Sequence, residues 1–338
     1  MRIVRTVAAL AAGALLASGL AACSDPADIT VYSGRSEVLV GPLIEQFTKE
    51  TGISVDVRYG DTAQMAAQLQ EEGDRSPADV FLEQDAGALG AVAKRGLFAV
   101  LPTEILSRVP DTYRAASGEW VGVTGRSRVL AYDSQRLTPE QLPASVLDLV
   151  GPQWRGRVGV APTNGSFQAF VTALRVQHGD DVARQWLADL AANDPQIRDN
   201  NVAIVKDIDE GRLEVGLVNH YYVFERADET GVGVDELRVK LHFFPGGDTG
   251  GLVNVSGVGL LATAADDEKA RRFIEYLLSP AGQEYFARET HEYPLVAGVA
   301  LDPALPALSD LEAPDIDLND LDTLAETVAM IQQSGLVS

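Results

Sequence analysis

The sequence predicts an α/β fold in which mostly parallel β-sheets are flanked by helices. Short runs of β-forming residues alternate along the chain with segments whose apolar residues recur at helical spacing. In such an order, helices connect neighbouring parallel strands through right-handed crossovers. The chain has 338 residues. Because single hydrophobic cores rarely extend beyond about 250–300 residues, this length also predicts two cores.

The first part of the chain shows the alternation clearly. Between residues 37 and 50 the apolar side chains have helical spacing, and Gly52 follows as a helix-ending glycine would. Residues 53–57 then alternate between apolar and polar, as a half-buried strand does. The same reasoning predicts strands at 29–32 and 77–82 and further helices at 65–73 and 89–95.

The second part of the chain repeats the pattern. We expect strands at 129–132, 157–160 and 213–218, an apolar glycine-containing segment at 252–261, and helices at 165–174, 181–190, 267–278 and 321–333. No low-complexity linker separates the two parts. The sequence therefore favours lobes that are joined by crossing strands over independent domains on a tether.

The N-terminus reads as a secretory signal at residues 1–22. Arg2 and Arg5 precede an apolar stretch that is short for a membrane span and ends in small residues. Cys23, the only cysteine of the chain, follows Leu-Ala-Ala and resembles the lipidated cysteine of the bacterial lipobox. We therefore expect lipidation at Cys23, a short tether at 23–27, and a protein held on the outer face of the cytoplasmic membrane. A buried structural thiol is the alternative.

The composition excludes some classes of partner. The formal net charge is -22 and 46% of the residues are hydrophobic. The hydrophobic content is that of a globular protein and too high for a disordered one. A strongly negative surface repels nucleic acid and anionic lipid headgroups, so neither is expected as a partner.

The adjacent residues Tyr221 and Tyr222 are the strongest indication of function. Phenols are poor acid–base groups at neutral pH, but phenolate is a hard anionic oxygen ligand that suits Fe(III). The alternative is a pair of half-buried strand aromatics. Neighbouring residues of a straight strand point to opposite faces, so both phenols reach one ion only if the chain turns within residues 219–222.

Several motifs occur in an order that resembles the ferric-ion-binding proteins of bacterial ABC importers. They lie at 29–35, 72–74, 77–81, 125–133, 219–222, 255–259 and 292–295. The resemblance implies a two-lobed type II periplasmic-binding-protein fold with two hinge strands. The first lobe would contain 28–128 and 252–302, and the second 129–251 and 303–338. Such a protein is a monomer without catalytic activity that captures ferric iron in the interlobe cleft and delivers it to the permease subunits.

The resemblance also implies a set of site residues, of which Tyr221 and Tyr222 would be the metal ligands. The positions of other ligands in the family hold Ser36, Gln84 and Phe167 here. A synergistic anion such as carbonate or phosphate would fill the remaining coordination positions. The matching anion-binding residues are Arg35, Arg126, Asn164, Gly165, Ser166, Asn201 and Asn219, and Tyr59, Glu83 and Gln84 are further residues of the cleft.

Alternatives remain open at these positions. Arg35 and Arg126 could form surface ion pairs, residues 164–166 could be an ordinary helix cap, and Tyr59 could be a packing residue. The same cleft could instead bind an organic anion or a phosphonate through Arg35, Ser166 and the asparagines. A secreted enzyme is the third interpretation, but no nucleophile elbow or Cys–His pair supports it.

Overall fold

A computed structural model describes residues 26–337. The predicted signal segment, Cys23 and most of the predicted tether lie outside the described residues. No helix within 26–337 has both the length and the apolar character needed to cross a membrane.

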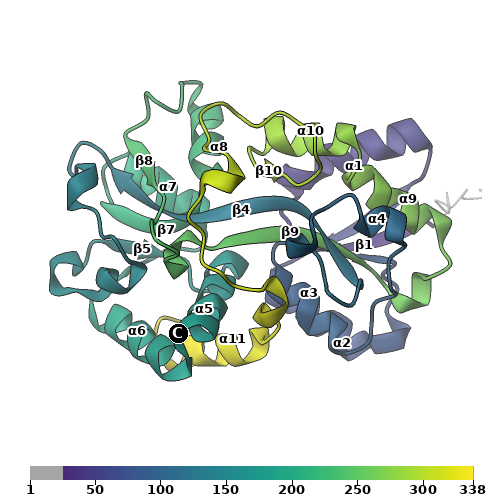
Figure 1. Cartoon of the computed structure of the whole chain (residues 1–338), viewed down its shortest axis with the longest axis horizontal. Coiled ribbons are helices and arrows are strands. Elements are labelled where there is room, and N and C mark those ends of the chain that lie inside the picture. Colours follow the sequence, from purple (N-terminus) through teal and green to yellow (C-terminus); the bar gives the residue numbers. More distant parts are fainter. Residues whose placement is uncertain (1–25, 338) are drawn as a thin grey trace, which may run out of the picture.

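A mixed ten-stranded sheet runs through the whole molecule (Figure 1). Its strands follow the order β2-β1-β3-β9-β4-β7-β5-β6, and β8 and β10 also pair with β4. The strands are β1 (Ile29–Ser33), β2 (Val55–Tyr59), β3 (Val80–Glu83), β4 (Trp120–Asp133), β5 (Val158–Val160), β6 (Gln196–Ile197), β7 (Val215–Asn219), β8 (Val239–His242), β9 (Val253–Leu260) and β10 (Tyr293–Pro294).

Helices flank this sheet at both ends of the molecule (Figure 1). They are α1 (Glu37–Thr51), α2 (Thr62–Glu72), α3 (Ala86–Ala93), α4 (Thr103–Leu106), α5 (Gly165–His178), α6 (Asp180–Ala192), α7 (Asn201–Asp209), α8 (Tyr221–Thr230), α9 (Glu268–Leu277), α10 (Pro280–Glu289) and α11 (Leu324–Gln333). The predicted Gly52 stop is confirmed: it has φ 73° and its N–H donates to the carbonyl of Thr48.

The expectation of mostly parallel sheets is correct only for the outer strands. The pairs β1–β2, β1–β3, β5–β6 and β5–β7 are parallel. Both long central strands, β4 and β9, pair antiparallel with all of their neighbours. The sheet is therefore mixed, because the strands that cross the molecule run against those they meet.

Strand β4 connects the two halves of the sheet. Its residues 120–127 pair with β9, and from Arg128 onward it pairs with β7 and β8 instead. The change of partner falls at the predicted lobe boundary near 128/129. The first residue of β9, Val253, lies next to the other predicted boundary at 251/252. The lobe limits themselves stay a prediction.

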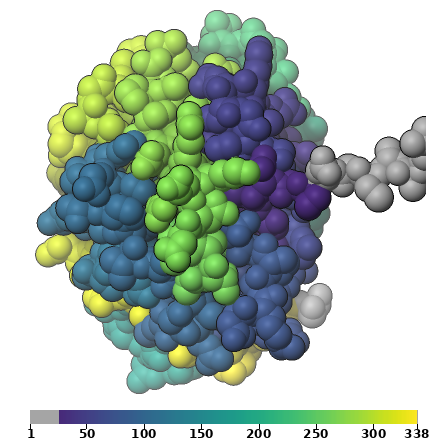
Figure 2. Space-filling view, turned by 90° about the vertical axis from the view of Figure 1, so that its right-hand side faces the viewer, coloured from purple at the N-terminus to yellow at the C-terminus, as the bar shows by residue number. Residues whose placement is uncertain are grey.

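The first half is assembled from segments that are distant in sequence. Figure 2 shows α9 between the N-terminal strand region and the segment near residue 108. Lys269 of α9 forms an ion pair with Asp28, and Arg108 donates to the carbonyl of Glu275 at 3.0 Å. These contacts join residues 28, 108 and 269–275 within the first half of the molecule.

The C-terminal segment contacts both halves. Met330 and Ile331 of α11 belong to the core around α5 and α6. The preceding residues Leu318 and Leu321 instead belong to the larger core, which contains residues of both halves, such as Leu89 and Ile204. Residues 318–321 form a separate 3-10 helix, so the predicted helix at 321–333 begins only at Leu324.

Candidate functional site

The chain turns at the tyrosine pair. Strand β7 ends at Asn219, His220 already has helical angles of φ -57° and ψ -42°, and α8 begins with Tyr221. The two phenol rings lie on the same side of this turn, with centroids 4.2 Å apart and an interplanar angle of 34°. The turn that a shared site requires is therefore present.

Tyr222 faces a cleft of about 510 Å³. The cleft is lined from the first half of the molecule by Gly34, Ser36, Val38, Leu39, Gly60, Asp61, Thr62 and Gln84, and from the second half by Asn164, Asn200, Val202, Val205, Tyr222, Glu225, Arg226 and Glu229. Tyr221 is fully buried beside it, and its hydroxyl has no hydrogen-bond partner among the described residues. Of the two phenols, only that of Tyr222 lines the cleft.

Three of the predicted anion-binding residues meet at the start of α5. The Asn164 Oδ1 atom accepts hydrogen bonds from the Ser166 N–H at 3.1 Å, the Ser166 Oγ at 2.6 Å and the Asn201 Nδ2 at 3.2 Å. Asn164 is therefore a helix cap, as the alternative interpretation states, and it also lines the cleft. The Oδ1 atom of Asn201 has no partner within residues 26–337.

Arg128, which the sequence interpretation did not select, lies at the centre of this group. It is 2% exposed, and its Nη1 donates to Ser166 Oγ at 2.9 Å while its Nη2 donates to the Leu217 carbonyl at 2.9 Å. Burial lowers the pKa of Arg128 to about 9. Arg126 and Arg128 are two residues apart on β4 and so point to the same face. This strand periodicity was the signal that could have identified Arg128 from the sequence.

A very small cavity lies beside the two arginines. It has a volume of about 10 Å³, close to that of one water molecule. Its lining brings together the predicted residues Gln84, Arg126, Ser166 and Asn219 with Asp85, Arg128, Leu252 and Asn254.

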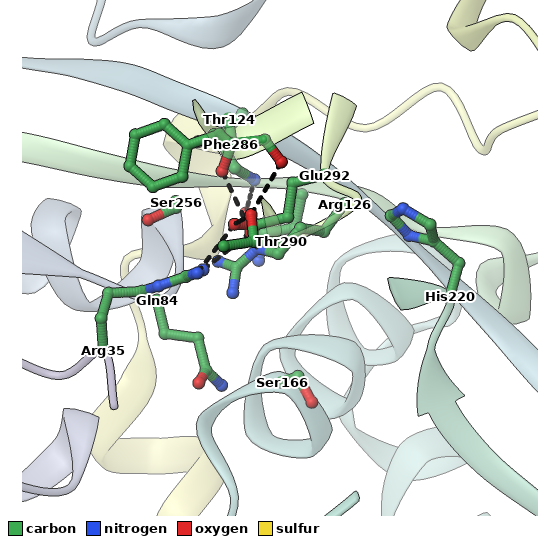
Figure 3. A network of polar contacts seen from close by, with 12 residues as sticks. Arg35, Gln84, Thr124, Arg126, Ser166, His220, Ser256, Phe286, Thr290 and Glu292 are labelled. Atoms are coloured by element: carbon green, nitrogen blue, oxygen red, sulfur yellow. Dashed lines mark hydrogen bonds and ion pairs between the residues drawn. The ribbon is translucent and has the colours of Figure 1, made fainter. Parts of the chain in front are cut away.

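Arg35 and Arg126 converge on one buried carboxylate, Glu292 (Figure 3). The Arg35 fork donates to both Glu292 oxygens at 2.8 and 2.7 Å, and the Arg126 Nε lies 3.6 Å from Oε1. Hydroxyls of Thr124 and Thr290 donate to the same carboxylate at 3.1 and 2.9 Å. The alternative interpretation expected surface ion pairs. Ion pairs are present, but they are buried, because all three charged side chains are at most 2% exposed.

These charges act on the phenols in opposite directions. Burial raises the pKa of Tyr221 above its ordinary value, and the guanidiniums of Arg35 and Arg126 counteract that rise. Burial also raises the pKa of Tyr222 strongly, and the adjacent Tyr221 adds to the effect. Burial would raise the pKa of Glu292 too, but Arg35 and Arg126 hold it below its usual value. Glu292 is therefore ionised.

The other acidic groups near the site differ in exposure and role. Glu83 is fully buried and does not line the cleft, and burial raises its pKa well above the usual range. Its carboxyl packs tightly against Gly34, where any side chain would overlap it. Burial raises the pKa of Asp85 to about 6 and that of Glu225 to about 7. Of these three groups, only Glu225 lines the cleft.

Two positions with aromatic side chains lie away from the cleft. Tyr59 ends β2 and its hydroxyl lies near Gly41 of α1, so it packs there as the alternative interpretation states. Phe167 is fully buried in the second core, 5.9 Å from Phe170 between ring centroids. Within residues 26–337 no group of three or more His, Cys, Asp or Glu side chains is arranged to hold a metal ion.

His220 holds the strand-to-helix turn in place. Its Nδ1 accepts the Ser127 N–H at 3.2 Å, so the proton lies on Nε2, which is 2.9 Å from the His291 carbonyl and donates to it. Burial lowers the pKa of His220 to about 4, which keeps the ring neutral. Its ring packs edge-on against Tyr221, at a centroid distance of 5.7 Å. His220 therefore connects the tyrosine pair to β4 and to the segment that carries Glu292.

Comparison with known proteins identifies the family. Residues 75–319 match the family described as bacterial extracellular solute-binding protein. The chain belongs to this family. Among its relatives, the Fe(3+)-binding periplasmic protein of Serratia marcescens is 35% identical over 98% of this chain and 97% of its own length. The major ferric iron-binding protein of Neisseria meningitidis is 33% identical over 96% and 98%.

Solved structures of this solute-binding family have the same fold. Iron-bound HitA from Pseudomonas aeruginosa superimposes with a TM-score of 0.86 at 35% identity, covering 92% of this chain and all of that one. A Trichodesmium protein in complex with iron and citrate ligands superimposes with a TM-score of 0.75 at 28% identity, covering 91% and 99%. The predicted type II periplasmic-binding-protein fold is confirmed by these likenesses.

Proposed function

We propose that this solute-binding protein captures ferric iron in its cleft and delivers it to the membrane permease of an ABC importer. The observation that carries the proposal is the pairing of Tyr221 and Tyr222 at a strand-to-helix turn, beside three buried arginines. Two phenolates offer hard anionic oxygens to a trivalent ion. The names of the relatives from Serratia and Neisseria support the same ligand.

Charge explains why an anion would accompany the iron. Arg35, Arg126 and Arg128 are buried near the phenols, whereas one carboxylate, Glu292, pairs with Arg35 and Arg126. Such an excess of positive charge repels a trivalent cation until an anion offsets it. We infer that carbonate or phosphate binds near Arg128 and Ser166, because a guanidinium fork and a helix N-terminus both favour oxyanions.

Iron loading would require the cleft to open. Tyr221 is fully buried, so a metal ion reaches its oxygen only when the two halves separate. The long strands β4 and β9 are the connections about which such a hinge motion would occur. Both phenols lose their protons to solvent as the metal binds, because a trivalent ion strongly favours phenolate.

The wider biological setting follows from the same proposal. Residues 1–22 would direct export, and lipidated Cys23 would hold the protein at the outer face of the cytoplasmic membrane. The partner would be the transmembrane subunits of the permease. We expect the protein to be a monomer and to catalyse no reaction.

A ferric titration of the iron-free protein tests the proposal. We expect a visible phenolate-to-iron charge-transfer band, and stronger iron binding when carbonate or phosphate is added. Tyr221→Phe and Tyr222→Phe should each weaken iron binding and reduce the band, while Tyr59→Phe serves as the matched control. Unchanged iron affinity in both tyrosine variants would refute the assignment. No response to iron in the unmodified protein would favour binding of an organic anion instead.

A further inference from the structure

The tyrosine pair leaves most coordination positions of a ferric ion open. Hard trivalent ions favour anionic oxygen ligands, and two phenolates supply only two. At the three positions where the resemblance would place further ligands, this chain has Ser36, Gln84 and Phe167. None of these side chains is an anionic oxygen donor. A further anionic oxygen from a residue of the cleft would therefore help the synergistic anion to balance the charge of the metal.

Glu225 has the right position on α8. Residues three and four apart on a helix are neighbours on its surface, with Cβ atoms about 5–6 Å apart. Glu225 follows Tyr222 by three residues and Tyr221 by four, so its carboxyl group lies over the face that carries both phenols. Glu225 and Tyr222 also line the same cleft.

The carboxyl group of Glu225 is not used by the fold. Its Oε1 atom is buried and has no hydrogen-bond partner among the described residues. The adjacent Arg226 is already paired, with Asp209 at 2.9 Å and Glu229 at 2.8 Å. Burying a carboxylate oxygen without a hydrogen-bond partner is energetically unfavourable. The presence of such an oxygen beside the phenols therefore indicates that it binds a ligand when the cleft is loaded.

Building on the proposed function, we propose that Glu225 is a third anionic oxygen ligand of the captured ferric ion. With Tyr221 and Tyr222 it would place three negative charges against the three positive charges of the metal. All three ligands would then come from the first two turns of one helix. The synergistic anion would be left to offset the charge of Arg128, which donates to Ser166 across the site.

Glu225→Gln tests this assignment, with Glu229→Gln as the matched control. Glu229 lies on the same helix and lines the same cleft, but Arg226 holds its carboxylate. We expect Glu225→Gln to weaken ferric binding by about 100-fold or more, since even indirect partners of metal ligands contribute about 10–100-fold. The charge-transfer band should move to longer wavelength, because loss of an anionic donor makes the iron a stronger electron acceptor. Glu229→Gln should leave the band in place.

The outcomes separate this inference from the proposed function. If the unmodified protein shows no charge-transfer band, the ferric function itself fails. If it shows the band, and Glu225→Gln matches Glu229→Gln in band position and affinity, then Glu225 is not a ligand and the ferric function stands. Should Glu225→Gln not fold, Glu225→Asp decides: a shortened ligand shifts the band, and an unchanged band overturns the assignment.

Discussion

Replacing Glu292 by glutamine should destabilise the protein strongly, because this carboxylate organises the most deeply buried charges. It is fully buried, and it accepts two hydrogen bonds from Arg35 and one each from Thr124 and Thr290. Glutamine is nearly isosteric, but its amide presents N–H groups where a guanidinium or a hydroxyl now donates. The variant also leaves Arg35 and Arg126 without their common counter-charge.

The expected loss is about 3–5 kcal/mol of unfolding free energy, the range for removing one partner of a buried ion pair. Two guanidiniums lose their partner in this case, so we expect the upper part of that range. The matched control is Glu214→Gln. Glu214 pairs with Arg157 at 2.6 Å, but its side chain is 24% exposed and that of Arg157 is 30% exposed. Because water screens such a pair, its loss should cost no more than about 1 kcal/mol.

Urea denaturation of the iron-free proteins, followed by far-UV circular dichroism, measures both losses. The pH dependence adds a second check. Arg35 and Arg126 hold the pKa of Glu292 below its usual value despite burial, so its contribution is complete above the unfolded-state value of about 4.3 and disappears as the pH falls through the folded-state value. The difference between unmodified protein and Glu292→Gln should therefore be constant near neutrality and narrow in acid. An equal loss in the two glutamine variants at pH 7 would refute the reasoning.

Three further substitutions test the supports of the site. His220→Phe removes one acceptor and one donor for buried backbone groups, so we expect a loss of about 2–6 kcal/mol in the same denaturation assay; a loss below 1 kcal/mol would contradict it. Arg128→Lys keeps the charge but not the fork that reaches Ser166, and should reduce the effect of added carbonate on ferric affinity about tenfold or more. In Gly165→Ala the new Cβ would lie 2.9 Å from the Thr62 Oγ1 across the cleft. We expect this overlap to make the closed form of the cleft less favourable by about 1–3 kcal/mol and to weaken iron binding accordingly. Combining it with Thr62→Gly should restore affinity; no restoration would rule out the clash.

Local patterns were sufficient to predict most of the regular elements. Helices such as α1 and α9 have apolar residues at clear helical spacing, and strands such as β1 are short β-forming runs. Residues 221–230 also have apolar residues at helical spacing, and Gly231 ends the helix. Its start has no such marker, because two tyrosines continue directly from a strand without glycine or proline. Only the chemical requirement for two converging phenols indicated the turn. The helix that carries it was not predicted.

Strand β4 shows why the pairing could not be predicted. The sequence predicted a strand only at 129–132, because Arg126 and Arg128 interrupt the apolar pattern. In the folded chain both arginines are buried, and their partners are Glu292 and Ser166. These partners are 166 and 38 residues away in sequence. A local pattern contains no information about contacts of that range, so two polar residues looked like the edge of a strand when they are its centre.

The same limit applies to Glu292 and Glu225. Glu292 was visible within a motif, but its function depends on the fork of Arg35, which lies 257 residues earlier. Glu225 required no long-range information, because its spacing from the tyrosines is purely helical. It was missed because the turn expected at 219–222 was not expected to begin a helix, and without a helix residue 225 would not have been grouped with the tyrosines.

The charge distribution connects the stability of the protein to its proposed chemistry. Burying Arg35, Arg126 and Arg128 together is unfavourable unless negative charges offset theirs, and Glu292 supplies only one negative charge. Without ligand, the remaining positive charge favours deprotonation of Tyr221, which burial opposes. An oxyanion bound beside Arg128 would relieve the excess charge and allow a trivalent cation to approach the phenols. Binding of anion and iron should therefore be cooperative: each should raise the affinity for the other by the same factor, as thermodynamic linkage requires.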